Sequence, residues 1–168
     1  VPFGTSLDSL IAAFTMSDNA KVFVQGTLQQ SAETANNFTS TVEYKVVAHD
    51  TNFYKTYFAN VSILPNTEAE LIAYSITTPN VLGTITPAAF GGYVDILLPA
   101  SADITNLAAT FTISDSASAY VNDSFQISAF THNDFSDTVV FVVLAQDKIT
   151  SNTYYISVDK IPASATQI

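Results

Sequence analysis

The side chains that could carry out chemistry in this 168-residue chain are few and scattered along it. There are two histidines, His49 and His132, and no cysteine. Neither histidine belongs to an HExxH or paired-histidine spacing, and the chain has no GxSxG sequence or glycine-rich phosphate loop. The lack of cysteine also excludes disulfides, thiolate metal sites and thiol catalysis. We therefore predict that the protein is not an enzyme, and we name no catalytic or cofactor-binding residue.

The best local cluster of acidic residues suggests a metal ion. Asp134 and Asp137 lie close together, and Asp123 lies on a preceding loop. Hard cations such as Ca²⁺ are bound by several carboxylate and carbonyl oxygens, usually from loops. The sequence has no DxDxDG run, and acidic loops are often merely solvated. Calcium bound by Asp123, Asp134 and Asp137 is therefore a hypothesis, and no other cofactor is expected.

Exposed aromatic rings are a second possible kind of site, because they can stack against ligands. The candidates are Phe53 and Tyr54 in the first half of the chain and Phe90 and Tyr93 in the second. A glycan-binding surface would use such rings as a platform. Aromatic side chains are more often buried, however, so core or interface roles compete with this interpretation.

Three Asn-x-Ser/Thr sequences, at Asn37, Asn60 and Asn122, could accept N-linked glycans. About that many arise by accident in a chain so rich in serine and threonine. We retain these three asparagines as candidate modification sites.

An internal repeat defines the framework that must position these residues. The segment FSDTVVFVVLAQD (residues 135–147) recurs as FTSTVEYKVVAHD (residues 38–50), and a single offset of 97 connects them. Extending this offset from Pro2 to Pro65 gives about 24 identities in about 64 gapless positions, which chance does not produce. Asp50 and Asp147 occupy matched positions, so we predict that they cap turns through their side chains. The chain therefore contains two copies of one module.

The repeat predicts two tandem immunoglobulin-like β-sandwich modules, a partial one over residues 1–65 and a complete one over residues 66–168. The apolar fraction is 48%, and short β-branched runs predict an all-β fold. The second module has two extra strands, residues 71–77 and 93–98, so the first lacks its initial strands. Other expected strands are residues 13–17, 21–24, 42–48 and 57–63. Residues 103–109 could form one helical turn, and Gly91 and Gly92 indicate a turn.

The net charge of −10 restricts the partners of this protein. Its only basic residues are five lysines, and residues 66–168 carry ten carboxylates against two lysines. Such a surface repels nucleic-acid phosphates and anionic lipids, so neither partner is expected. The longest apolar runs are far shorter than the roughly 20 residues of a membrane-spanning helix. The lack of cysteine is compatible with secretion, and we expect an extracellular or cell-surface location.

The two copies differ most at one strand. Glu43 and Lys45 on the outer face of the first copy are replaced by Val140 and Val142 in the second. A strand that is apolar on both faces is expected to be covered on both. We predict that Val140, Val142 and Leu144 form an interface with another module or subunit. A loop of the same module, residues 78–90, could cover them instead.

The second copy as a whole resembles the bacterial immunoglobulin-like, cadherin-like repeats found in tandem in cell-surface proteins. The resemblance is carried by Pro99, Ile104-Thr105-Asn106-Leu107, Phe111-Thr112-Ile113-Ser114, Asp134-Phe135-Ser136, residues 138–147 and Tyr154-Tyr155-Ile156-Ser157-Val158. It departs from the family pattern where Thr51 and Lys148 replace a usual glycine. The resemblance implies a β-sandwich and says little about activity.

We therefore expect a non-enzymatic extracellular structural or adhesive protein. One version is a filament subunit, in which a strand from a neighbouring subunit completes the partial module by donor-strand complementation. The alternative is a glycan-binding accessory module of a surface polysaccharide-capture system. Retention on a polysaccharide gel that is lost on Phe53→Ala or Tyr93→Ala would favour this alternative.

Overall fold

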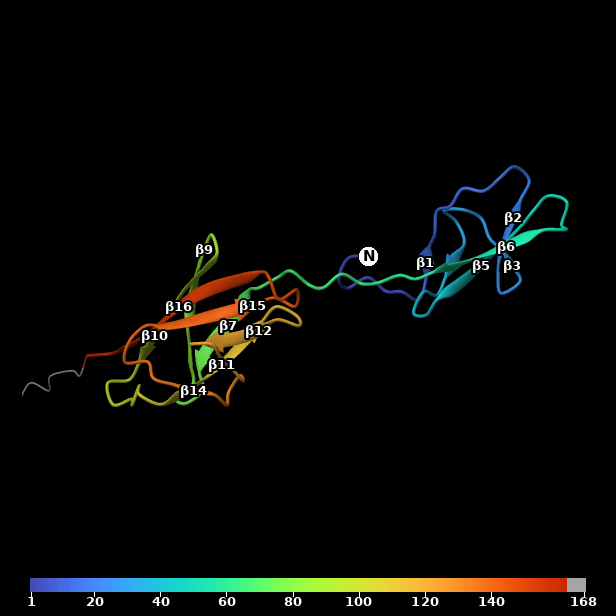
Figure 1. Ribbon diagram of the computed structural model, residues 1–168. Helices are drawn as coiled ribbons and strands as arrows, with labels where there is room; N and C mark the ends of the chain where they lie inside the picture. The colour runs from blue at the N-terminus through green and yellow to red at the C-terminus, as the bar shows by residue number, and fades with distance from the viewer. Residues whose placement is uncertain (163–168) are drawn as a thin grey trace, which may run out of the picture. The chain divides into compact units, whose positions relative to one another are not determined.

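The computed structural model describes residues 1–162, and Figure 1 shows that they form strands joined by loops. The described residues contain no helix, so the predicted all-β fold is confirmed. The chain divides into two compact units, Val1–Leu64 (unit 1) and Pro65–Ile168 (unit 2). No helix that could cross a membrane is found in the described part of the chain.

Unit 2 is a sandwich of two sheets. The six-stranded sheet has the order β13 (Ser124–Phe125), β12 (Ser118–Val121), β15 (Val139–Leu144), β16 (Ser151–Lys160), β10 (Gly91–Leu98) and β9 (Thr84–Ala88). The four-stranded sheet has the order β14 (His132–Asn133), β11 (Leu107–Ile113), β7 (Leu71–Ile76) and β8 (Val81–Leu82). Only β10 and β16 are described as a parallel pair; the other pairs are antiparallel.

The core of unit 2 follows from the alternation of side chains along its strands. From Gly92 to Leu98 of β10 the residues at every second position are buried, and the intervening ones are exposed. Tyr74 of β7 packs edge-on against Phe141 of β15, with 5.4 Å between ring centroids. Burial raises the pKa of the Tyr74 phenol, whose hydroxyl has no hydrogen-bond partner among the described residues. These rings join the two sheets into one apolar core.

Unit 1 repeats part of this arrangement. Its four-stranded sheet has the order β3 (Thr27–Leu28), β2 (Lys21–Val24), β5 (Val42–Val47) and β6 (Tyr54–Ala59), and β1 (Leu10–Ile11) pairs with β4 (Ala35–Asn36). At the offset of 97 these strands match β13, β12, β15, β16, β11 and β14 in turn. Unit 1 has no described counterpart of β7, β8, β9 and β10. The predicted β-sandwich arrangement is thus confirmed, and the description of residues 1–65 as a partial module stays a prediction.

The repeated hydrogen bonds explain why identities recur outside the strands. Gln29 and Gln126 are both buried, and each accepts a bond from the matched asparagine: Asn36 at 2.7 Å and Asn133 at 2.9 Å. Asp50 accepts a bond from the amide of Asn52, and Asp147 from the amides of Ile149 and Thr150. Asp50 and Asp147 therefore do cap turns. The polar groups of these identical residues are therefore used for hydrogen bonds within the fold, which makes them poor candidates for binding a ligand.

Three local expectations were wrong. Residues 13–17 are not a strand; the strand lies earlier, at β1. Residues 103–109 form no helical turn, and β11 begins at Leu107. Gly91 and Gly92 begin β10 instead of forming a turn. The physical reason for the glycine is close packing, because a Cβ on Gly91 would lie only 1.8 Å from the carbonyl oxygen of Thr153.

We expect Gly91→Ala to destabilise unit 2 by about 3 kcal/mol. Gly91 has a φ of +129°, and the added methyl group would collide with the backbone of β16. Chemical denaturation measures the change. The matched control is Gly26→Ala, where φ is +81° but nothing lies within 4 Å, and we expect a loss of about 1 kcal/mol. Equal losses for the two variants would contradict the packing argument.

Three exposed carboxylates of unit 2 predict a specific sensitivity to acid. Hydrogen bonds from Thr105, Ser136 and Thr150 lower the pKa values of Asp103, Asp134 and Asp147 respectively. A lowered pKa in the folded state means that the stabilisation is present above the unfolded value of about 3.9 and is lost as the pH falls below it.

Unit 1 carries neutral Ser6 and Asn37 where unit 2 carries Asp103 and Asp134. We therefore expect acidification from neutral pH to about pH 3 to destabilise unit 2 more than unit 1. Amide hydrogen exchange, resolved by residue, measures both units in the same sample. Equal loss of protection in the two units would contradict this expectation.

Candidate functional site

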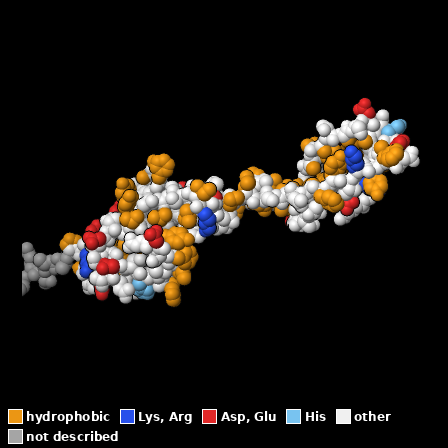
Figure 2. Space-filling model, viewed as in Figure 1, with side chains coloured by type: hydrophobic (Ala, Val, Ile, Leu, Met, Phe, Trp, Pro, Cys, Tyr) orange, Lys and Arg blue, Asp and Glu red, His pale blue; other side chains and the backbone are white. Residues whose placement is uncertain are grey.

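Two surface features remain as candidate sites after the residues shared by both copies of the repeat have been assigned to the fold. The first is a row of exposed rings on the outer face of the six-stranded sheet of unit 2. The second is an apolar groove in unit 1. Figure 2 shows that hydrophobic side chains reach the visible surface of both units.

The row of rings is set by the register of three strands. Tyr93 of β10 pairs with Tyr155 of β16, and Tyr155 pairs with Val140 of β15. All three point away from the core, with exposed fractions of 53%, 43% and 42%. The two tyrosine rings stack with their centroids 5.7 Å apart and their planes at 26°. We call Tyr93, Tyr155 and Val140 the aromatic platform.

The neighbouring outer-face positions extend the platform. Val142 pairs with Thr153 on one side and with Tyr120 on the other. Tyr120 contacts Phe125 edge to face, with 5.8 Å between centroids. Hydroxyl and carboxyl groups lie beside the rings, on Thr86 opposite Tyr93 and on the pair Asp95 and Ser157. Apolar rings bordered by polar groups suit a ligand that has both kinds of surface.

The four aromatic residues that the sequence analysis named do not form one surface. Phe53 and Tyr54 belong to unit 1, and Phe90 and Tyr93 belong to unit 2. The ammonium group of Lys45 lies 4.2 Å from the ring centroid of Tyr54, a cation–π contact. Phe90 is 82% exposed and contributes its backbone carbonyl to β16. Tyr93 alone has a stacked partner, Tyr155, which the sequence analysis missed.

The predicted interface residues lie on the face that carries the platform. Val140 is exposed, and Val142 and Leu144 are half-buried among their outer-face neighbours. Residues 84–88 form β9 at the edge of the sheet, where β9 pairs with β10, and both β10 and β16 lie between β9 and β15. An interface with another module or subunit stays a prediction for this face.

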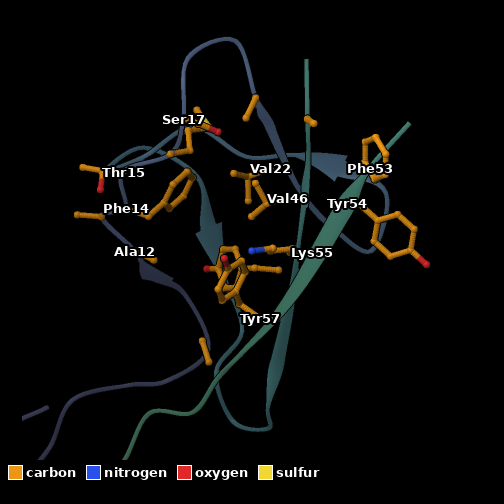
Figure 3. Close-up of a pocket in the computed structure, with 16 residues that line it drawn as sticks. Ala12, Phe14, Thr15, Ser17, Val22, Val46, Phe53, Tyr54, Lys55 and Tyr57 are labelled. Atoms are coloured by element: carbon orange, nitrogen blue, oxygen red, sulfur yellow. The ribbon is translucent and has the colours of Figure 1, made fainter. Parts of the chain in front are cut away.

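The groove of unit 1 has a volume of about 880 Å³. Its lining includes residues 12–17, Val22 and Val46, and Phe53, Tyr54, Lys55 and Tyr57, as Figure 3 shows. Five aromatic side chains are among the lining residues: Phe14, Tyr44, Phe53, Tyr54 and Tyr57. Phe14 and Tyr44 touch edge to face, with 6.1 Å between centroids. Burial raises the pKa of the Tyr44 phenol, and the hydrogen bond from Asn36 partly offsets this effect.

The predicted calcium ligands do not come together as a site. No group of three or more histidine and carboxylate side chains that could hold a metal ion occurs within residues 1–162. Asp134 and Asp137 line one shallow pocket, and Asp123 is not part of its lining. Asp134 already accepts a hydrogen bond of 2.8 Å from the amide of Ser136. Calcium binding stays a prediction that calorimetric titration can test.

The three candidate glycosylation sites are all exposed. Asn37 accepts bonds from Thr39, and Asn60 accepts a bond of 2.6 Å from the hydroxyl of Thr41. Asn122 lies in the turn between β12 and β13 with a φ of +47°. Glycosylation at these sites stays a prediction.

The histidines are engaged locally. Nδ1 of His132 lies 3.0 Å from the carbonyl oxygen of Phe130, and His49 is exposed at the end of β5. They lie in different units.

The fold and the exposed rings define an all-β module that presents aromatic side chains on the outer face of a sheet. Residues 1–61 and 71–158 match the protein family described as "SGBP, N-terminal". The chain belongs to this family of surface glycan-binding modules. The two matched stretches fall one in each unit.

No curated protein matches the chain. Among solved structures, the chain is similar to a protein of Bacteroides thetaiotaomicron that is provisionally described as a glycoside hydrolase. The two are 24% identical, with a TM-score of 0.44, over 60% of this chain and 27% of that one. The chain thus spans about a quarter of the length of that protein. At this TM-score the likeness carries no argument about function.

The family match corrects one expectation about this protein and favours another. The resemblance to cadherin-like repeats indicated the wrong family, because a β-sandwich pattern is shared by many unrelated surface proteins. Adhesion and filament formation gain no support. The alternative, a glycan-binding accessory module, is the one that the family favours.

Proposed function

We propose that this chain is a non-catalytic module of a cell-surface polysaccharide-capture system, and that it contacts the polysaccharide through the aromatic platform. The observation that carries the proposal is the stacked pair Tyr93 and Tyr155 on a rigid outer sheet face. The family membership supports the same class of ligand.

Sugar rings and the platform have complementary chemistry. A pyranose ring presents apolar C–H groups on its faces and hydroxyl groups at its rim. The rings of Tyr93 and Tyr155 offer an apolar surface, and about half of each side chain is open to solvent. Because the two rings stack on each other, little conformational freedom is lost when a sugar binds. Thr86, Asp95 and Ser157 can form hydrogen bonds with the rim hydroxyls.

The negative charge of unit 2 restricts the class of polysaccharide that the platform can bind. Asp95 and Asp159 lie on the outer positions of β10 and β16, beside the platform. Residues 66–168 as a whole carry far more carboxylates than lysines. An anionic polysaccharide would be repelled by this surface, so we assign the platform to a neutral one.

A spacing role is the second candidate function, and a separate observation favours it. The repeat-matched polar residues are used for internal bonds: Gln29 and Gln126, Asn36 and Asn133, and Asp50 and Asp147. A chain with this function would position a binding domain of the same protein without touching the glycan.

Affinity gel electrophoresis with soluble polysaccharides distinguishes the two functions. Neutral starch, β-glucan and mannan are compared with anionic alginate. Retarded migration in at least one neutral polysaccharide, with free migration in alginate, supports the proposal. Unretarded migration in all of them supports the spacing role, and retardation in alginate alone contradicts the assignment to a neutral ligand.

A further inference from the structure

The outer face of the six-stranded sheet in unit 2 carries more exposed apolar surface than the aromatic platform alone. Phe125 of β13 is 57% exposed, and Tyr120 of β12 is half-buried beside it. Val142 pairs with Tyr120 on one side and with Thr153 on the other. Thr153 lies two positions before Tyr155 in β16, so both side chains are on the same face. Uncharged side chains therefore run without interruption from the platform to β13.

A tight hairpin holds the far end of this run in place. Asn122 and Asp123 are the two residues between β12 and β13, and their φ angles are both positive, 47° and 61°. Two-residue turns of this kind match the twist of the flanking strands and fix their register. The register places Phe125 opposite Tyr120, where the two rings touch edge to face. The far pair of rings is thus positioned before any ligand binds.

Unit 1 shows that the fold does not require this run of uncharged side chains. Lys45 of unit 1 stands where unit 2 has Val142, and it pairs with Phe23. Glu43 is exposed on the same face of β5. Two charged side chains therefore interrupt the outer face of unit 1, although the strands that carry them pair as in unit 2. The uncharged run is a property of unit 2 alone.

The spacing of the strands gives the length of this surface. Tyr93 lies on β10 and Phe125 on β13, and β16, β15 and β12 lie between them in the sheet. Adjacent strands are about 4.8 Å apart, so the four intervals span about 19 Å. A pyranose unit of an extended chain is about as long as one such interval, so the surface accommodates about four units.

We propose that the aromatic platform is one end of a longer binding surface, which holds about four consecutive units of a neutral polysaccharide across the strands. This inference rests on the function proposed above. We call this surface the extended row, and its members are Tyr93, Tyr155, Val142, Tyr120 and Phe125.

The chemistry of the extended row selects an internal stretch of the polysaccharide. None of its five side chains is charged, so the row offers no cation to an anionic sugar. Its apolar surfaces contact the C–H faces of successive sugar units, and Thr153 adds a hydroxyl group beside them. These contacts are made along the length of the ligand and require no chain end.

The dependence of affinity on ligand length tests this inference. The probes are oligosaccharides of two to six units that correspond to the polysaccharide that retards the protein: malto-oligosaccharides for starch, cello-oligosaccharides for β-glucan and manno-oligosaccharides for mannan. NMR titration measures each affinity and shows which amides respond. We expect the affinity to rise at least about 10-fold from two to four units and to change little beyond five. The hexasaccharide should shift the amide signals of β12 and β13.

Two variants and a matched control locate the far end of the extended row. Phe125→Ala should weaken binding of the hexasaccharide about 10-fold. Val142→Lys introduces the charge that Lys45 carries in unit 1, and it should weaken this binding at least as much. Leu28 is the counterpart of Phe125 in unit 1 and is 50% exposed, so Leu28→Ala should leave the affinity unchanged. If Phe125→Ala unfolds unit 2, Val142→Lys decides the question alone.

The proposed function and the length of the site fail on different results. If neither the polysaccharides nor the oligosaccharides bind, the proposed function is wrong, and the extended row is wrong with it. If Tyr155→Ala weakens binding of the hexasaccharide but Phe125→Ala and Val142→Lys do not, the platform binds sugar and only the extended row is wrong. Equal affinities for the disaccharide and the hexasaccharide also contradict the extended row alone. Amide signals of Tyr120 and Phe125 that shift with protein concentration, without sugar, would instead assign this end to an interface between copies of the chain.

Discussion

Replacing Tyr155 with alanine is expected to weaken binding to a neutral polysaccharide about 30-fold, the equivalent of about 2 kcal/mol. Tyr155 lies in the middle of the aromatic platform, between Tyr93 and Val140, so its removal takes away a stacking surface and also frees the ring of Tyr93. Isothermal titration calorimetry with the polysaccharide that retards the protein most strongly measures the change. Tyr93→Ala should weaken binding in the same direction.

The repeat offers a matched control for this substitution. Phe58 is the counterpart of Tyr155 in unit 1 and is 67% exposed, but Glu43 lies opposite it where unit 2 has Val140. Phe58→Ala should therefore leave the affinity unchanged. Full affinity in Tyr155→Ala, or equal losses in the two variants, would show that the platform is not the contact surface. Unchanged unfolding free energies in both variants confirm that the folds are intact.

Phe141→Ala is expected to destabilise unit 2 by about 3 to 5 kcal/mol. Phe141 is 1% exposed and contacts Tyr74 and Phe111 from the opposite sheet, with centroid separations of 5.4 Å and 5.0 Å. Truncation removes these contacts and leaves a cavity that the stiff surrounding strands cannot close. Chemical denaturation followed by circular dichroism measures the loss.

The counterpart of Phe141 in unit 1 provides the comparison. Tyr44 packs against Phe14 and Phe38, but it also lines the open groove. Tyr44→Ala should lower the free energy of unfolding by only about 2 kcal/mol. One side of the Tyr44 ring faces the groove, so its removal leaves fewer neighbouring side chains without packing contacts. A loss for Tyr44→Ala as large as that for Phe141→Ala would mean that the groove is sealed in solution.

The fold was predictable because the repeat and the alternation of side chains are properties of the sequence itself. Residues 41–46 alternate between polar and apolar, and β5 lies at Val42–Val47, where Val42 and Tyr44 are buried and Glu43 and Lys45 are exposed. The strand ends were less predictable. Residues 13–17 have a strand-like composition, but they border the groove, where no described strand offers an edge to pair with.

The site was only partly predictable, because pairing between distant strands decides which exposed residues meet. The sequence identified Tyr93 and Val140 separately, and the alternation in β16 places Tyr155 on the outer face. The parallel register of β10 and β16 then brings Tyr93 against Tyr155, 62 positions further along the chain. The calcium hypothesis depended on proximity in sequence, and the structure does not gather Asp123 with Asp134 and Asp137.

The parallel ladder between β10 and β16 determines how unit 2 responds to tension along the chain. Asn66, at the start of the unit, lies beside Asp147, near the end where β16 begins, and the chain leaves β16 at its far end, after Lys160. A pull on the two ends of the unit therefore acts along the strands and loads the eight paired positions of the ladder in shear. Strands sheared in this way must break many hydrogen bonds at once instead of unzipping them one after another. Rupture under force is thus governed by the unfolding rate of the whole ladder.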